Sequence, residues 1–258
     1  MKGKMKAIVY HGQNDLRLEE LDIPEIGPKD VLLKTKYASI CGSDLHAVRR
    51  GPKWAKAEKQ IFGHEFAAEI AEVGSEITRY KVGDRVFGVN MAFCGECWYC
   101  RHQDYAHCTG VGDHYTGQGI PGACAQYFKF TDPESEYAFA PYLNSLMPIP
   151  DEMTDEQCAM MEPFGVGLGA VNKAGVKEGD TVVILGTGII GISSLQWCKA
   201  RGARVIVVGR GRHRLDIAKK CGADHVVSTL DGDCYEQVAA LTEETGWYWG
   251  KETTTVDA

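Results

Sequence analysis

Four cysteines lie close together within residues 93–108, FCGECWYCRHQDYAHC. They are spaced C-x2-C-x2-C-x7-C and comprise Cys94, Cys97, Cys100 and Cys108. Four thiolates in one short loop can form the closed tetrahedral shell of a structural zinc ion. The main alternative is an iron–sulfur cluster, whose ferredoxin-type run has its fourth cysteine after three residues and before proline, whereas Cys108 follows seven residues. A dithiol redox centre would need only two of the four. The spacing therefore favours structural zinc.

A second set of possible metal ligands is dispersed along the chain. It consists of Cys41, His64, Glu65 and Glu162. Sulfur, nitrogen and oxygen donors that converge suit a catalytic zinc ion, which keeps one position open for exchange. Each residue alone is weak evidence, because a single histidine or cysteine is more often packed than bound to metal. Sequence separation cannot show whether the four converge.

A glycine-rich turn follows the apolar run TVVIL and opens an apolar helical segment. Its residues are Gly186, Thr187, Gly188, Ile189, Ile190 and Gly191. In this context G-x-G-x-x-G is a dinucleotide-binding fingerprint, in which the glycines permit the turn, the approach of the pyrophosphate and the packing of helix on strand. The start of the helix supplies amides and partial positive charge for phosphate. The alternative is a purely structural glycine turn.

The end of the next apolar strand differs from an NAD site. In an NAD site an acidic side chain after this strand normally holds the ribose 2′-hydroxyl. Here RVIVV runs into a stretch without a carboxylate that contains Gly209, Arg210 and Arg212. Either arginine could bind a 2′-phosphate. The alternative is a solvated basic start of a helix, but that would not explain the missing acid, so we expect NADP in preference to NAD.

Two kinds of chain organisation must position these residues. Up to about Pro150, short β-branched or alternating runs broken by Gly, Pro and Asp predict a small antiparallel barrel or sandwich; they are KAIVY, DVLLKTKYAS, FAAEIAEV, GDRVFGV and AQYFKF. From Thr154 the apolar spacing becomes helical, and Pro163 can open a second helix. Continuous apolar strands then alternate with helices, which predicts a parallel sheet covered on both faces. Residues 131–145 are expected to form a linking loop.

Composition limits the classes of protein further. The 258 residues carry 28 basic and 35 acidic side chains, so we expect no nucleic-acid partner and no binding to anionic membranes. The sequence lacks a signal peptide and a stretch of the ~20 apolar residues that span a bilayer, which predicts a cytoplasmic protein. Ten cysteines in such a compartment indicate metal or thiol chemistry.

Together these residues resemble the zinc-dependent medium-chain alcohol dehydrogenases, particularly the polyol (sorbitol), butanediol and threonine dehydrogenase branches. The resemblance rests on Gly63-His64-Glu65, on CGSDLH from Cys41, on the four-cysteine lobe and on EPFGVG from Glu162, and it covers essentially the whole chain. It implies a GroES-like β-barrel catalytic domain at 1–152 with a structural-zinc lobe at about 91–112. Linking helices are then expected at 153–174, followed by a Rossmann domain at 175–258.

The resemblance also implies roles for individual residues. Cys41, His64 and either Glu65 or Glu162 would hold the catalytic zinc ion, and the other glutamate could act through water. Asp44 would orient His64, because zinc-bound imidazoles usually need such a partner. Ser43 and His46 would relay the proton while hydride passes between an alcohol or polyol and the nicotinamide ring. The expected cofactors are therefore two zinc ions per chain, one catalytic and one structural, and NADP.

Length is the main departure from this family. Three strands of the Rossmann sheet are expected, and TTTVDA at the end of the chain reads as the start of a fourth. We therefore expect an incomplete Rossmann domain and a truncated chain, and the resemblance implies a homo-oligomer for the full-length form. Two other classes stay open, a non-catalytic zinc-stabilised nucleotide-binding protein and a thiol redox or metal-sensing protein. Two zinc ions per chain would support the enzyme, one the binding protein and none the thiol protein.

Overall fold

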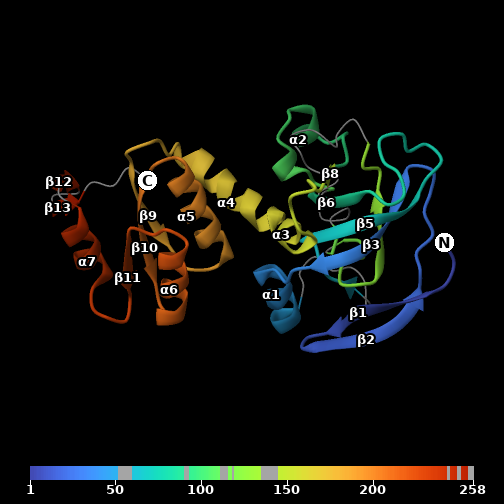
Figure 1. Ribbon diagram of the computed structural model, residues 1–258, viewed down its shortest axis with the longest axis horizontal. Helices are drawn as coiled ribbons and strands as arrows, with labels where there is room; N and C mark the ends of the chain where they lie inside the picture. The colour runs from blue at the N-terminus through green and yellow to red at the C-terminus, as the bar shows by residue number, and fades with distance from the viewer. Residues whose placement is uncertain are drawn as a thin grey trace. The chain divides into compact units, whose positions relative to one another are not determined.

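The computed structural model describes residues 1–51, 60–89, 93–110, 116–117, 119–134 and 145–242, with the backbone of 245–248 and 251–254 (Figure 1). Most of the loop predicted at 131–145 lies outside these residues. The chain divides into two compact units, Met1–Glu162 and Pro163–Ala258. Among the described residues, no helix has the length and apolar character needed to cross a bilayer.

The first unit consists mainly of antiparallel strands. Its larger sheet has the order β7-β3-β5-β6-β8 and the smaller one has the order β2-β1-β4. The strands are β1 (Lys4–Gly12), β2 (Asp15–Asp22), β3 (Asp30–Ala38), β4 (Gln60–Ile61), β5 (Phe66–Val73), β6 (Arg85–Val89), β7 (Tyr127–Thr131) and β8 (Ser145–Pro148). The five runs predicted as strands fall on β1, β3, β5, β6 and β7. An isolated antiparallel bridge between Ala7 and Ala125 connects β1 with the residues just before β7.

Short helices complete this unit. They are α1 (Gly42–Arg50), α2 (Trp98–Arg101), the 3-10 turn η1 (Tyr105–His107) and α3 (Asp155–Ala159). Helix α3 begins where the apolar spacing changes, because the Thr154 hydroxyl accepts a hydrogen bond from the Gln157 amide at 3.2 Å and caps it. The core of the larger sheet includes Phe66, Phe128 and Phe130, all of which are buried. This packed sheet holds the ends of β3 and β5, between which the candidate metal ligands lie.

The second unit is a three-stranded parallel sheet in the order β11-β10-β9, with α5 and α6 beside it (Figure 1). Its elements are α4 (Met161–Ala174), which begins in the first unit, β9 (Thr181–Leu185), α5 (Ile189–Ala200), β10 (Arg204–Gly209), α6 (Arg212–Lys220), β11 (His225–Ser228) and α7 (Cys234–Leu241). Val205 and Val207 of β10 pack in one cluster with α5 and α6, whereas Ile206 and Val208 pack with α7. The sheet is covered on both faces, as its continuous apolar strands predict.

The end of the described chain differs from the prediction. TTTVDA, residues 253–258, was expected to open a fourth parallel strand, but of these residues only Thr253 and Thr254 lie in the described part of the chain, where they belong to β13. Strands β12 (Thr245–Tyr248) and β13 (Lys251–Thr254) instead form an antiparallel pair separate from the parallel sheet. Only two residues separate these strands in the sequence, and a connection that short permits antiparallel pairing but not a parallel crossover.

Candidate metal centres and cofactor-binding loop

The four clustered cysteines converge in the structure. All four Sγ atoms lie within 4.8 Å of one another. Cys94 Sγ is 3.6 Å from Cys108 Sγ and 4.0 Å from Cys100 Sγ. A tetrahedral zinc ion with four Zn–S bonds of about 2.3 Å places its sulfurs about 3.8 Å apart. These separations therefore fit a zinc tetrahedron and are far too long for disulfide bonds.

Backbone amides surround the same sulfurs. Helix α2 begins at this cluster, because Cys97 caps it and accepts a hydrogen bond from the Cys100 amide at 3.4 Å. The amides of Cys97 and Gly110 donate in the same way to Cys94 Sγ and Cys108 Sγ, each at 3.4 Å. Amides of Cys100 and Thr109 lower the pKa of the Cys97 thiol to about 6. Thiolate is the form that binds metal, so these amides favour the metal-binding form of Cys97, whereas burial raises the pKa of Cys100 to about 12.

A second group of donors lies in the first unit, at the ends of β3 and β5. The donor atoms of Cys41, His64 and Glu65 lie within 4.8 Å of one another. Cys41 is the residue before α1, whereas His64 and Glu65 directly precede β5. The Gly63 backbone approaches the segment before β7 so closely that a Cβ there would lie 2.7 Å from the Cys124 nitrogen. Glycine is therefore required at the position that leads into His64.

Glu162 lies near this group but is not one of its three members. It is half-buried, and burial raises the pKa of its carboxyl, an effect that nearby His64 opposes and nearby Glu65 reinforces. These electrostatic contacts place Glu162 in the neighbourhood of His64 and Glu65. Of the two glutamates that the sequence left as alternatives, Glu65 is the one in the compact three-donor group.

Asp44 connects the start of α1 to the histidine. Its Oδ2 accepts a hydrogen bond from the Cys41 amide at 3.0 Å, and its Oδ1 lies 3.6 Å from His64 Nδ1. Burial raises the pKa of Asp44, and nearby His64 opposes this effect. The Ser43 Oγ is buried, whereas His46, one helical turn further along α1, is exposed. Burial raises the pKa of the Cys41 thiol, and hydrogen bonds from Ser43 act against this.

One contact at this site was not predicted. The Ser39 hydroxyl donates a hydrogen bond to Glu65 Oε2. Ser39 lies two residues before Cys41, but a serine after a predicted strand carries no recognisable metal-site signal. Only the pairing of β3 with β5 places it opposite Glu65.

The glycine-rich turn connects β9 to α5 in the second unit. Gly186 has φ +116°, a backbone conformation that favours glycine. A Cβ on Gly191 would lie 2.2 Å from the Gly186 carbonyl oxygen, so this glycine permits α5 to pack against the end of β9. Gly188 caps α5, and a Cβ there would meet nothing within 4 Å. The space above Gly188 is therefore open to a ligand, as the fingerprint requires.

The end of β10 packs against this turn. A Cβ on Gly209 would lie 2.5 Å from Thr187 Cγ2, so the two loops are in close contact. Arg210 and Arg212 are both exposed, and Ile189 and Ile190 at the start of α5 are 42% and 38% exposed. Exposed isoleucines directly after the turn leave apolar surface beside the expected pyrophosphate position.

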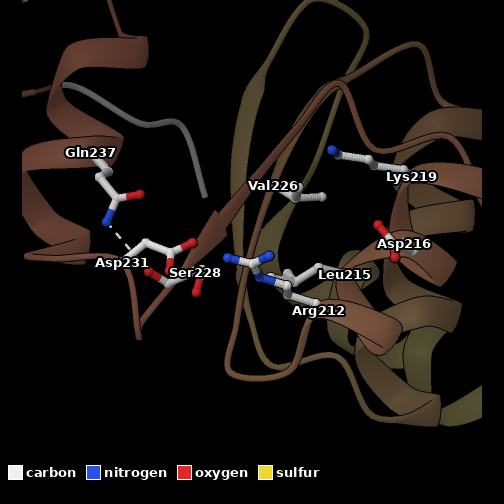
Figure 2. Close-up of a pocket in the computed structure, with 8 residues that line it drawn as sticks. All are labelled: Arg212, Leu215, Asp216, Lys219, Val226, Ser228, Asp231 and Gln237. Atoms are coloured by element: carbon white, nitrogen blue, oxygen red, sulfur yellow. Dashed lines mark hydrogen bonds between the residues drawn. The ribbon is translucent and has the colours of Figure 1, made fainter.

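A pocket of about 440 Å³ lies beside β11 and distinguishes the two arginines (Figure 2). Arg212 lines it and Arg210 does not. The remaining lining residues are Leu215, Asp216, Lys219, Val226, Ser228, Asp231 and Gln237. Figure 2 shows the Arg212 guanidinium turned toward Ser228 and Asp231, while Asp216 lies with Lys219 on α6. The stretch 209–214 has no acid, but folding brings Asp216 and Asp231 to the pocket. Sequence spacing could not reveal Asp231, because it follows β11, whereas Asp216 lies about one turn after Arg212 on the same helix.

The comparisons with known proteins agree on one family. Residues 27–141 match the family described as "Alcohol dehydrogenase GroES-like domain", and residues 190–254 match "Zinc-binding dehydrogenase". The chain is 36% identical over 261 residues to L-threonine 3-dehydrogenase of Rhizobium etli (strain CIAT 652), covering 98% of this chain and 70% of that protein. The chain thus belongs to the zinc-dependent medium-chain alcohol dehydrogenase family.

Two further similarities show how much of such a protein the chain spans. It is 35% identical over 245 residues to sorbitol dehydrogenase of Bacillus subtilis (strain 168), covering 94% of this chain and 66% of that protein. A zinc-binding dehydrogenase structure from Sinorhizobium meliloti 1021, bound to NADP, matches with TM-score 0.82 and 28% identity, covering 92% of this chain and 65% of that one. The chain therefore spans about two thirds of the length of these relatives.

Proposed function

We propose that this chain carries the metal and cofactor sites of a zinc-dependent dehydrogenase that transfers hydride between a secondary alcohol or polyol and NADP. The convergence of Cys41, His64 and Glu65 carries this proposal, because three different donor types from separated segments meet in one group. Among the relatives, sorbitol dehydrogenase and L-threonine 3-dehydrogenase support an alcohol or polyol as the substrate.

The donor set fits a catalytic zinc ion. Cys41, His64 and Glu65 would hold it, and Glu162 nearby would act through water. Three protein ligands leave one position for exchange, whereas the four-cysteine lobe would hold a closed structural ion. Zinc at the first site would supply Lewis-acid chemistry that makes an alcohol hydroxyl more acidic. Asp44 would keep the His64 ring in place, supported by the 3.6 Å separation of Asp44 Oδ1 and His64 Nδ1.

Ser43 and His46 would move the hydroxyl proton away from the substrate. The buried Ser43 Oγ can accept a proton near the metal ligands, and the exposed His46 ring on the same helix can pass one to solvent. Residues three apart on a helix are neighbours on its surface. The buried position of the Ser43 Oγ and the exposed position of His46 therefore support a relay that carries the proton from the site to solvent.

The cofactor would bind the second unit. Backbone groups at residues 186–191, with the open space above Gly188, would accept the pyrophosphate at the start of α5. Arg212 and Lys219 are the cations that line the pocket beside β11, and they support the NADP preference because they could form charge-assisted hydrogen bonds with a 2′-phosphate against the repulsion of Asp216 and Asp231 in the same lining. Arg210 is exposed at the end of β10 and is the second candidate for the 2′-phosphate. Bound nicotinamide would accept or return the hydride.

The domain limits also belong to this proposal. A catalytic domain at 1–152 with a zinc lobe at about 91–112 is supported by the antiparallel sheets and the cysteine cluster. We interpret the two sheets as parts of one GroES-like barrel, supported by the bridge between Ala7 and Ala125. Linking helices at 153–174 and a nucleotide-binding domain from 175 fit α3, α4 and the parallel sheet. Homo-oligomer formation and a cytoplasmic location stay predictions.

Metal analysis of the purified chain tests the proposal most directly. We expect two zinc ions per wild-type chain. The variant Cys41→Ser should hold one zinc ion, the one bound by the four clustered cysteines. Dehydrogenase activity is then assayed with secondary alcohols and polyols by following NADPH absorbance. Ser43→Ala is expected to lower turnover roughly 100-fold while both zinc ions stay bound. An unchanged metal content in Cys41→Ser would refute the catalytic site, and unchanged turnover in Ser43→Ala would remove Ser43 from the relay.

A further inference from the structure

Ser39 is joined to Glu65 by two separate contacts. Its amide donates to the Glu65 carbonyl oxygen at 3.0 Å, and its hydroxyl donates to Glu65 Oε2. The backbone contact continues the β3–β5 ladder beyond its last pair, Ala38 with Phe66. The ladder alone would hold the two segments together. The side-chain contact is therefore an additional feature that acts on the carboxylate itself.

Glu65 needs such a partner because it is only 3% exposed. A buried carboxylate is costly unless hydrogen bonds or a cation compensate it. Ser39 is half-buried and comes directly after β3, so its hydroxyl is held by the sheet rather than by a mobile loop. A hydrogen bond to Oε2 restricts the side-chain torsions of Glu65, which also fixes the direction in which the carboxylate faces Cys41 and His64.

We propose that Ser39 is a positioning residue that orients the Glu65 carboxylate for metal binding. The inference rests on the proposed function, because it takes Cys41, His64 and Glu65 as zinc ligands. Ser39 touches neither substrate nor cofactor in this account; it acts through Glu65. Hydrogen-bond partners that orient metal ligands typically contribute roughly 10- to 100-fold in metal affinity. We expect the loss of the Ser39 hydroxyl to weaken this one site by that factor.

Three variants separate positioning from a general structural effect. Ser39→Ala removes the hydroxyl, and Ser39→Thr keeps it. Thr35→Val is the matched control, because Thr35 lies on the same strand and its hydroxyl donates to the Ala123 carbonyl oxygen at 3.2 Å instead of to Glu65. All three keep their backbone amides and hence the β3 ladder. Thermal unfolding of the zinc-free proteins shows whether any variant has lost its fold.

Metal affinity is measured by competition between the full chain and a chromophoric zinc chelator. Cobalt-loaded protein supplies a second readout, because the visible bands of cobalt depend on its ligands; the spectrum of Cys41→Ser is subtracted to remove the contribution of the four-cysteine site. We expect Ser39→Ala to weaken zinc binding at the Cys41 site roughly 10- to 100-fold and to change the difference spectrum. Ser39→Thr and Thr35→Val should retain wild-type affinity and spectrum.

Other outcomes overturn the inference in distinguishable ways. Unchanged affinity and spectrum in Ser39→Ala would refute positioning while leaving the zinc site intact. Equal weakening in Ser39→Ala and Thr35→Val, or no recovery in Ser39→Thr, would show that the effect comes from the strand and not from the hydroxyl. Equal metal content in the wild type and Cys41→Ser would refute the zinc site itself, and with it both proposals.

Discussion

Two glycines of the same turn are expected to lose different properties when a methyl group is added: one substitution lowers stability and the other weakens cofactor binding. In Gly191→Ala the new Cβ would lie 2.2 Å from the Gly186 carbonyl oxygen, about 1.2 Å short of ordinary contact. That oxygen is backbone at the end of β9, so it cannot turn aside. Helix α5 must therefore move away from the sheet against which it buries Leu195 and Cys198. Gly191→Ala should destabilise the second unit.

The size of this loss follows from two opposing contributions. Overpacking against a fixed backbone atom costs about 3 kcal/mol, at the upper end of the usual range. Alanine recovers about 1 kcal/mol over glycine within a helix. The net loss is about 2 kcal/mol in the free energy of unfolding, which lowers the Tm of a unit of this size by roughly 8 to 16 °C. Urea or thermal unfolding followed by circular dichroism measures it.

Gly188→Ala provides the matched comparison. A Cβ at Gly188 would meet nothing within 4 Å, and φ −77° suits alanine. The smaller chain entropy of the unfolded state and the poorer helix cap roughly cancel, so stability should change by less than about 0.5 kcal/mol. The methyl group would, however, occupy the space expected for the pyrophosphate. Losing one charge-assisted hydrogen bond costs about 1.5–3 kcal/mol, or roughly 10- to 150-fold in the Kd for NADP.

The pair separates packing from binding in one experiment. Wild-type stability in Gly191→Ala would show that α5 does not approach β9 as closely as described. Wild-type NADP affinity in Gly188→Ala, measured by calorimetric titration, would show that the turn is not the pyrophosphate site. Either result would refute the corresponding step of the reasoning without affecting the other.

Three further predictions concern other parts of the chain. Arg212→Ala should weaken NADP binding by about 10-fold or more and NAD binding by less, and Arg210→Ala should weaken NADP binding less than Arg212→Ala does. Equal losses of NADP and NAD affinity in Arg212→Ala would refute recognition of the 2′-phosphate. Cys108→Ser should remove one zinc ion and lower thermal stability while leaving the Cys41 site loaded, and metal content with a melting curve tests this. Burial acts to raise the pKa of Asp224, but hydrogen bonds from Lys199 and the Val205 amide outweigh it and hold the pKa below its ordinary value. The ionised Asp224 therefore stabilises the fold above its unfolded pKa, and this contribution is lost as pH falls through its folded pKa. Asp224→Asn should be less stable than wild type at pH 7, and the difference should shrink as pH falls toward 3. A difference in stability that stays constant with pH would contradict the lowered pKa of Asp224.

Local sequence patterns predicted much of this fold correctly. The apolar run TVVIL coincides with β9 at Thr181–Leu185, and RVIVV lies within β10 at Arg204–Gly209, because fully buried strands need continuous apolar residues. Strands β2 and β8 were not predicted. Strand β2 is an edge strand with mostly exposed side chains, so burial leaves little pattern in it. The antiparallel pair of β12 and β13 was not predicted, and Thr253 and Thr254, expected to open a fourth parallel strand, lie in β13 instead.

The sequence by itself determined the sites whose residues are close along the chain. Four cysteines within one loop can reach one ion whatever the rest of the chain does, and the glycine turn lies between a strand and a helix that the apolar pattern already indicates. The tertiary structure decided what depends on distant segments. It brought Cys41 to His64 and Glu65 through the pairing of β3 with β5, placed Ser39 on the Glu65 carboxylate, and gathered Asp231 with Arg212 beside β11. Contacts between distant segments are set by strand register and packing, which no local spacing encodes.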